Sequence, residues 1–420
     1  MSKDIFINDL AQPILNKEQR SIVESLQKIN IKLNKDEILA EACEITALND
    51  FGSMDFEERL SLLCNAWNAN VNLTSIGLLS LRAKLTQFAA NRLLIHQSLV
   101  SNPQIEEVKI VDPIIVVGLP RSGTTHLLNL LAADKRLRSL PLWESYEPIQ
   151  NPNEPQNGEI NPRYTRCNNA WEMMQKTVPL LSIMHPMHPE HIHEELELMG
   201  PDFASYNFEW LCQTPEWRDH YFSSDQTKHY QYMKNVLKIL TWQDGDKDGS
   251  KTRWVLKCPQ HLEQLAVLKK TFPDAKVIFT HRDPVSVIQS TITMIAYGHR
   301  MSRKKVDLNE VYDYWSERVM HLLKACVQDR QLISGNDSLD IYFHEFINDE
   351  IKTIQSIYQL INLDLNDDAR DNIFNYSKTK NPLRHGKIVY NLKENFGKDA
   401  ESLRARFKFY FDAFAIQPDT

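Results

Sequence analysis

The chain has no long apolar run, no paired cysteines and no excess of positive charge, and each absence excludes a class of protein. No apolar stretch reaches the roughly 20 residues that a membrane-spanning helix needs, and the start lacks the basic and apolar regions of a signal peptide. The six cysteines are scattered without a C-x-x-C pair, which argues against a disulfide framework or a structural zinc site. A net charge of −7 provides no bulk attraction to nucleic acid or anionic lipid. We therefore expect a cytoplasmic protein with no integral membrane segment and no nucleic-acid partner; the oligomeric state stays open.

The most informative motif is a glycine-bounded loop between an apolar strand and a helix. Residues 114–117 read IIVV, and GLPRSGTT follows at 118–125. Backbone N–H groups around two such glycines form an anion-binding nest, and the next helix adds the positive end of its dipole. Loops that bind nucleoside triphosphates carry a lysine directly after the second glycine, but Thr124 stands there and the cation of this loop is Arg121. The loop therefore fits a phosphate-like anion, and the missing lysine points away from ATP.

Hydrophobic periodicity divides the chain into a helical first part and an alternating second part. Residues 1–108 show helical patterns and form a predicted α-helical lead-in. In residues 109–420 strand and helix patterns alternate, which predicts an α/β domain with a P-loop-type central parallel sheet flanked by helices and with ligands at the carboxyl ends of strands. Residues 151–249 form a helical and loop insertion, whose aromatic and methionine side chains are either core or part of an acceptor pocket. Strands are expected at 114–117, 254–256, 276–280 and 339–343, and helices at 124–133, 261–272, 284–297 and about 350–361.

A second cationic motif follows the strand expected at 276–280. Arg282 leaves the strand end, Pro284 suits the first turn of a helix, and Ser290 lies eight positions beyond Arg282 on that helix. An arginine fork and a nearby hydroxyl can share one phosphate. Taken alone, the adjacent arginine and aspartate fit a salt bridge or a helix-start device equally well.

Four segments together resemble the 3'-phosphoadenosine-5'-phosphosulfate (PAPS)-dependent sulfotransferases, most closely the bacterial-type branch with an R-S-G-T-T loop. They are PRSGTT at 120–125, WVLKCPQHL at 254–262, FPDA at 272–275 and HRDP at 281–284 with its following Ser290. The resemblance implies in-line transfer of a sulfonate group from PAPS to a hydroxyl or amine of a small-molecule or lipid-like acceptor. The product would be 3',5'-bisphosphoadenosine (PAP). A P-loop kinase, or a catalytically silent nucleotide-binding module, is the alternative.

The resemblance also implies roles for individual residues. His385 stands where relatives carry a lysine, which makes its charge depend on pH. The segment from Tyr390 to Gly397 resembles the C-terminal segment of the family. The residues expected on the cosubstrate are Arg121, Ser122, Gly123, Thr124 and Thr125 at the 5'-phosphosulfate, Arg282 and Ser290 at the 3'-phosphate, and Arg384, His385 and Gly386 in a segment that closes over the same phosphate.

Physical chemistry independently favours a cationic site. Negative charge grows on the departing phosphate oxygen during sulfuryl transfer, so Arg121 and the loop N–H groups lower the barrier when they lie there. A Mg²⁺ site would need a carboxylate at a strand end, whereas these strands end at Lys257 and at His281-Arg282. We therefore expect no metal cofactor, and Lys257 is a candidate contact to the transferring group.

Two residues are candidate general bases for the acceptor proton. Glu144 follows the loop helix, where some branches of the family place a catalytic glutamate. His261 lies four residues after Lys257 and resembles the catalytic histidine of the cytosolic branch, in which the two residues are closer together. The choice stays open, because Glu144 is equally suited to cap a helix and His261 to begin one.

A histidine-rich segment runs from His185 to His193. Its side chains match the ligands of Zn²⁺, but its prolines remove the regular spacing of a helix. An acceptor gate or a surface loop is therefore favoured over a metal site. Glu194 and Glu195, which follow directly, are candidate acceptor contacts.

Overall fold

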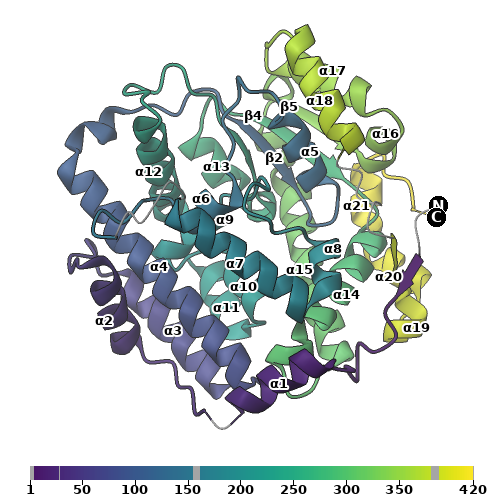
Figure 1. Ribbon diagram of the computed structural model, residues 1–420. Helices are drawn as coiled ribbons and strands as arrows, with labels where there is room; N and C mark the ends of the chain where they lie inside the picture. Colours follow the sequence, from purple (N-terminus) through teal and green to yellow (C-terminus); the bar gives the residue numbers. More distant parts are fainter. Residues whose placement is uncertain (1–3, 28, 155–160, 380–386, 420) are drawn as a thin grey trace.

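The computed structural model describes residues 4–27, 29–154, 161–379 and 387–419, which form helices around a central sheet (Figure 1). This sheet is four-stranded and entirely parallel. The predicted fold class is confirmed, and each of the four expected strands is present. In their order across the sheet, the strands are β3 (Val255–Lys257), β2 (Ile114–Gly118), β4 (Lys276–His281) and β5 (Ser338–Tyr342).

The sheet is buried on both faces because its strands are apolar on both sides. Ile114 and Val116 of β2 pack on one face with α5 (Thr124–Leu131), α17 (Glu350–Leu360) and α18 (Asp367–Thr379). Ile115 and Val117 pack on the other face with α4 (Ser75–Ser101), α12 (Thr227–Gln243), α13 (Leu265–Thr271), α14 (Pro284–Ser302) and α15 (Leu308–Asp329). Figure 1 shows these two groups of helices on opposite sides of the sheet. The helices that alternate with or follow the strands are α5 (Thr124–Leu131), α6 (Leu142–Tyr146), α13 (Leu265–Thr271), α14 (Pro284–Ser302), α15 (Leu308–Asp329), α16 (Phe343–Asn348), α17 (Glu350–Leu360), α18 (Asp367–Thr379), α19 (Leu392–Phe396), α20 (Ala400–Arg406) and α21 (Lys408–Ala413).

The other helices belong to the N-terminal region and to the insertion. Within the described ranges, no helix is both long enough and apolar enough to cross a bilayer. The N-terminal helices are α1 (Lys17–Leu26), α2 (Lys35–Thr46), α3 (Phe56–Ala69) and α4 (Ser75–Ser101), and those of the insertion are α7 (Pro162–Thr177), α8 (Pro179–Met184), α9 (Leu196–Met199), α10 (Asn207–Leu211), α11 (Pro215–Ser223) and α12 (Thr227–Gln243).

A separate core joins the N-terminal helices to the insertion. Phe203, Phe208 and Trp217 of the insertion are buried among apolar residues of α2, α3 and α4. The interpretation of the insertion's aromatic and methionine side chains as core is therefore correct for Phe203 and Phe208, but it is wrong for Met173, which is exposed. The two parts of the chain fold as neighbours because each supplies half of this interior.

A buried ion cluster fixes the same contact. One carboxylate oxygen of Asp202 accepts hydrogen bonds from Arg59 of α3 at 3.0 Å and from Arg92 of α4 at 2.9 Å. Its other oxygen lies 2.5 Å from Nδ1 of His229 in α12. A carboxylate this deeply buried is tolerated because it is paired and hydrogen-bonded.

Two elements differ from the sequence pattern. Where a helix is expected at 261–272, the chain forms a 3-10 turn, Pro259–Glu263, followed by α13. Hydrogen bonds to both ring nitrogens of His261 fix the position of this turn. A short strand, β1 (Asp4–Phe6), was not expected. It pairs in parallel with β6 (Lys387–Val389) in a two-stranded sheet outside the central one.

Candidate active site

The glycine-bounded loop lies where the strand order of the central sheet reverses. β2 comes first along the chain, and its neighbours β3 and β4 lie on opposite sides of it. The connections from β2 and β4 therefore leave toward different faces, and ligands of such folds bind at the carboxyl ends of the strands at this point. Residues 119–123 of the loop follow β2 directly there.

Glycine is required on both sides of the loop, on one side by a close contact and on the other by the backbone conformation. A Cβ atom on Gly118 would lie 2.0 Å from Oγ1 of Thr280 in β4, so no larger residue fits there. Gly123 has a φ of +88°, which glycine adopts without strain, and it is the N-cap of α5. The hydroxyl of Ser122 donates to the Leu119 carbonyl at 2.6 Å and shares a hydrogen bond of 2.8 Å with Thr280. The loop is thus fixed to β4 at the start of a helix.

Three neutral oxygen atoms hold the side chain of Arg121. Its Nε donates to Oγ of Ser290 at 2.9 Å, Nη1 donates to the Met184 carbonyl at 2.6 Å, and Nη2 donates to the Tyr390 hydroxyl at 3.4 Å. The φ of Arg121 is +67°, an uncommon backbone conformation that recurs at functional sites. Because none of these acceptors carries a charge, the guanidinium keeps its positive charge for an anion.

Arg282 contacts the loop from the end of β4. Its Nη1 donates to the Arg121 carbonyl at 2.8 Å, and its Nε donates to Asp419 at 2.7 Å. The guanidinium also lies over the Phe343 ring, 3.9 Å from the ring centre. Together with the bond from Arg121 to Ser290, these contacts bring the two predicted anion motifs into one cluster.

Lys257 reaches the loop from the end of β3. Its Nζ donates to Oγ1 of Thr125 at 3.3 Å and forms an ion pair with Glu194. Only 1% of Lys257 is exposed; burial lowers its pKa to about 7, and the nearby Arg121 cation acts in the same direction. The carboxylate of Glu194 against the ammonium group favours its charged form.

His261 is completely enclosed. Its Nε2 lies 2.7 Å from one carboxylate oxygen of Glu195, and its Nδ1 lies 2.8 Å from the Tyr230 hydroxyl. The second oxygen of Glu195 accepts from the backbone N–H of Lys257 at 2.8 Å. Both ring nitrogens of His261 are therefore engaged, and the residue connects to Lys257 only through Glu195 in the part of the chain that is described.

Glu144 belongs to a different ion cluster. Its two carboxylate oxygens each lie 2.8 Å from the guanidinium of Arg138. Arg138 also donates to Asp244 at 2.8 Å. The contacts of the Glu144 carboxylate thus lead to the end of α12 rather than to the loop.

The histidine-rich segment is partly buried. His191 and His193 are buried, so the interpretation as a surface loop is wrong for them. The ring centres of His185 and His193 are 5.8 Å apart. Burial, with the charges of Arg121 and Lys257, lowers the pKa of His185 to about 3, and burial holds the pKa of His193 well below its ordinary value. Two neutral rings therefore lie beside the two cations; within the described ranges, no group of three metal-ligating side chains gathers.

Three residues expected at the 3'-phosphate, Arg384, His385 and Gly386, lie outside the described residues. The described chain resumes at Lys387, and Tyr390 follows three residues later with its hydroxyl on Arg121.

Several contacts of this site were missed by sequence reasoning. Met184 and Asp419, which contact Arg121 and Arg282, carry no motif, and the segment that begins at Tyr390 matched the family without indicating the contact of its hydroxyl with Arg121. Glu194 was named as an acceptor contact and not as the partner of Lys257. Its signal was an acidic pair placed directly after a segment rich in histidine and proline, a composition unusual for an interior.

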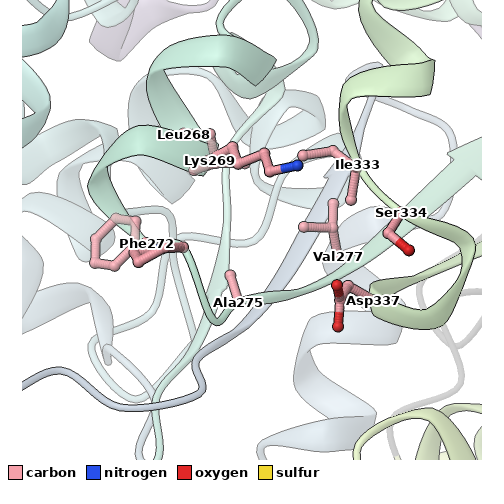
Figure 2. A pocket seen from close by; sticks show the side chains of 9 residues that line it. Leu268, Lys269, Phe272, Ala275, Val277, Ile333, Ser334 and Asp337 are labelled. Atoms are coloured by element: carbon pink, nitrogen blue, oxygen red, sulfur yellow. The ribbon is translucent and has the colours of Figure 1, made fainter.

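A small hollow elsewhere on the molecule is not part of this site. It lies where β4 begins, at the amino end of the strand, and therefore at the opposite edge of the sheet from the loop (Figure 2). Lys269 beside it donates to the Leu332 carbonyl at 2.6 Å, and Asp337 is paired with Lys276 at 2.6 Å. Its charged groups are thus already satisfied.

Comparisons with known proteins agree with this geometry. The sequence model of the sulfotransferase family matches residues 113–367, more than half of the chain. The omega-hydroxy-beta-dihydromenaquinone-9 sulfotransferases Stf3 of Mycobacterium bovis and Mycobacterium tuberculosis are each 23% identical over 286 residues, which are 64% of this chain and 67% of theirs. Sulfotransferase STF1 from M. tuberculosis H37Rv has a TM-score of 0.76 and 27% identity, covering 89% of this chain and 98% of that one. Sulfotransferase STF9 from Mycobacterium avium has a TM-score of 0.80 and 24% identity, covering 93% of this chain and 98% of that one. The resemblance is confirmed: the chain belongs to the sulfotransferase family and is a PAPS-dependent sulfotransferase.

Proposed function

We propose that the chain transfers the sulfonate group of PAPS to the hydroxyl of a lipid-like acceptor and releases PAP without a metal cofactor. The contacts that join Arg121 to Arg282 and Ser290 carry this proposal. A bisphosphorylated nucleotide needs positive charge at two places. Arg121 with the N–H groups of residues 122–125 supplies it at the 5'-phosphosulfate, and Arg282 with Ser290 supplies it at the 3'-phosphate.

The chemistry of transfer follows from these positions. The bond between sulfur and the acceptor oxygen forms as the bond between sulfur and the bridging phosphate oxygen breaks. Negative charge then grows on that phosphate oxygen, where Arg121 and the loop N–H groups stabilise it. Lys257, which already donates to Thr125 from β3, contacts the sulfonate oxygens.

We propose Glu194 as the group that takes the proton of the acceptor hydroxyl. Its carboxylate is paired with Lys257 next to the loop, and it becomes available when the ammonium turns toward the sulfonate. The other two candidates have less freedom: His261 has partners on both nitrogens, and Glu144 is ion-paired with Arg138, which donates a hydrogen bond to one of its oxygens. We therefore assign His261 to holding Glu195 and Glu144 to holding Arg138.

Two observations support a lipid-like acceptor. A relative at 23% identity is named for transfer to an omega-hydroxylated dihydromenaquinone. The rings of His185 and His193 supply an uncharged wall beside Arg121 and Lys257. We further propose residues 109–420 as the sulfotransferase domain, with 151–249 as its insertion and 1–108 as a helical support.

Isothermal titration calorimetry with PAP, AMP and ATP, with and without Mg²⁺, tests the nucleotide site. We expect PAP to bind most tightly and to be indifferent to chelator. Arg282→Ala should reduce the affinity for PAP to that for AMP. The affinity for AMP should stay unchanged, because AMP has no 3'-phosphate. A preference for Mg-ATP would overturn the proposal in favour of a kinase or a nucleotide-binding module.

Arg121→Ala separates transfer from binding. We expect the rate of transfer to fall about 100-fold or more, while PAP, which lacks the sulfonate group, binds within about threefold of its original affinity. Equal decreases in the rate of transfer and in the affinity for PAP would mean that Arg121 only holds the nucleotide.

Mass spectrometry of a lipid extract treated with PAPS and the protein identifies the acceptor by its gain of one sulfonate.

A further inference from the structure

The N-terminal strand is paired with a strand close to the active site. β1 and β6 align in parallel with Ile5 opposite Ile388 and Phe6 opposite Val389. Figure 1 shows the purple N-terminal strand beside the C-terminal helices. A two-stranded sheet is only marginally stable in water, so this one needs anchors from the rest of the molecule.

The residues that follow β1 provide these anchors. Ile7 and Leu10 are each 3% exposed and belong to the main core. Between them, Asp9 forms an ion pair of 3.1 Å with Arg300 of α14. The guanidinium of Arg300 in turn lies 3.7 Å from the centre of the Tyr297 ring. The N-terminal segment is thus fixed to the C-terminal half of α14, the helix that also carries Ser290.

Both elements next to this segment lead to Arg121. The Tyr297 hydroxyl accepts from the backbone N–H of Leu180 in α8 at 3.3 Å, and α8 ends at Met184, whose carbonyl holds Arg121. On the other side, β6 continues into Tyr390, whose hydroxyl holds the second terminal nitrogen of Arg121. Two of the three acceptors on this guanidinium therefore belong to elements that the N-terminal segment supports.

We propose that β1 is a positioning element of the transfer site: by pairing with β6 it holds the Tyr390 hydroxyl against Arg121. The inference rests on the proposed role of Arg121 in transfer. Neither β1 nor Tyr390 touches the reacting atoms; both act on the rate by fixing the guanidinium before the substrate binds, so that no reorganisation is needed in the transition state.

Tyr390→Phe tests the contact itself, because it removes one hydroxyl and keeps the ring. Loss of one hydrogen bond to a charged group lowers kcat about fivefold. The KM for PAPS and the affinity for PAP stay within about twofold of the original values, since the ring and the loop are unchanged. An unchanged kcat would overturn the proposal.

A paired set of variants tests the strand. Successive N–H groups of a strand point to opposite sides, so the double variant Ile5→Pro/Phe6→Pro removes at least one donor from the ladder. Ile5→Ala/Phe6→Ala trims the same side chains and keeps both donors. We expect the proline variant to show a fivefold or greater loss of kcat relative to the alanine control, with PAP affinity preserved. Equal kcat values would overturn the proposal.

Combining the proline pair with Tyr390→Phe closes a double-mutant cycle. If β1 acts through the Tyr390 hydroxyl, kcat of the combined variant falls no further than kcat of the proline pair alone. A decrease equal to the product of the two separate decreases would refute this route. Thermal unfolding of each variant verifies the fold. If the proline variant does not fold, Asp9→Asn takes its place, and the same fivefold loss of kcat with preserved PAP affinity is expected. Failure of the original protein to bind PAP would refute the proposed function, whereas normal activity in every variant would refute this inference alone.

Discussion

The Nε atom of Arg282 donates to the Asp419 carboxylate at 2.7 Å, so a C-terminal side chain neutralises the cation that we assign to the 3'-phosphate. A nucleotide that reaches Arg282 must replace this carboxylate. Asp419→Asn removes the competing charge and keeps the shape of the side chain. We expect PAP to bind about threefold to fivefold more tightly, which is the value of a partly exposed ion pair. Calorimetric titration measures the change, and AMP should bind both forms equally. Weaker binding of PAP would show instead that Asp419 orients Arg282.

The three candidate bases differ in what their removal should do. Glu194→Gln keeps a polar group beside Lys257 but removes the proton acceptor, so we expect kcat to fall about 100-fold. The decrease of kcat toward low pH, which reports protonation of the base, should disappear with it. Glu144→Gln and His261→Asn should retain that decrease and instead lower the unfolding temperature, because each opens a buried contact.

Profiles of kcat against pH for the three variants decide between these residues. If the decrease of kcat toward low pH disappeared in Glu144→Gln or in His261→Asn but persisted in Glu194→Gln, the residue replaced in the variant that lost the decrease would be the base.

Acid should destabilise the fold through two histidines whose pKa is lowered. Burial lowers the pKa of both His185 and His299 from 6.5 to about 3, so their rings are neutral in the folded chain. Between these two pKa values the unfolded chain binds more protons than the folded one. The free energy of unfolding therefore decreases as pH falls from 6.5 toward 3, by up to about 1.4 kcal/mol per pH unit for each histidine. In His299→Gln, the free energy of unfolding measured by urea denaturation should depend less steeply on pH over this range, by the contribution of one histidine. An unchanged dependence on pH would contradict the lowered pKa of His299.

Gly118 should be among the least replaceable residues of the loop. In Gly118→Ala the new Cβ meets Thr280 Oγ1 at 2.0 Å, and either this hydroxyl leaves its hydrogen bond with Ser122 or the strands move apart. We expect a loss of about 2 kcal/mol or more in the free energy of unfolding, together with weaker PAP binding. Gly335→Ala is the matched control, because a Cβ there meets nothing within 4 Å, and it should leave both quantities nearly unchanged. Equal stability of the two variants would show that the strands adapt to the extra atom.

The central sheet was predictable because its elements carry local signals. Apolar runs predicted each of the four strands, and the glycine-bounded loop predicted where α5 begins. Pro284 after an Arg-Asp pair predicted the start of α14 and therefore the relative positions of Arg282 and Ser290. These signals extend over a few residues, and the contacts they imply follow from the geometry of a parallel sheet.

Contacts between distant segments left no such signal. His261 resembled a base because it follows Lys257, although at a wider spacing than in the cytosolic branch, and its partners Glu195 and Tyr230 come from positions 66 and 31 residues away. Glu194 reaches Lys257 through an insertion whose path depends on packing and not on periodicity. β1 is three residues long, too short for alternation to distinguish it from a loop.

The hydrogen bond between Arg121 and Tyr390 spans 269 positions of the chain. Lys257, the last residue of β3, and Arg282, which follows β4, lie between them in sequence. Native contacts between such distant positions form late, because the intervening chain must be ordered first. A partially folded molecule can retain most of its helices and still lack the anion site. The capacity to bind PAP is therefore a stricter measure of native structure than helix content, and it distinguishes correctly folded preparations from compact but incomplete ones.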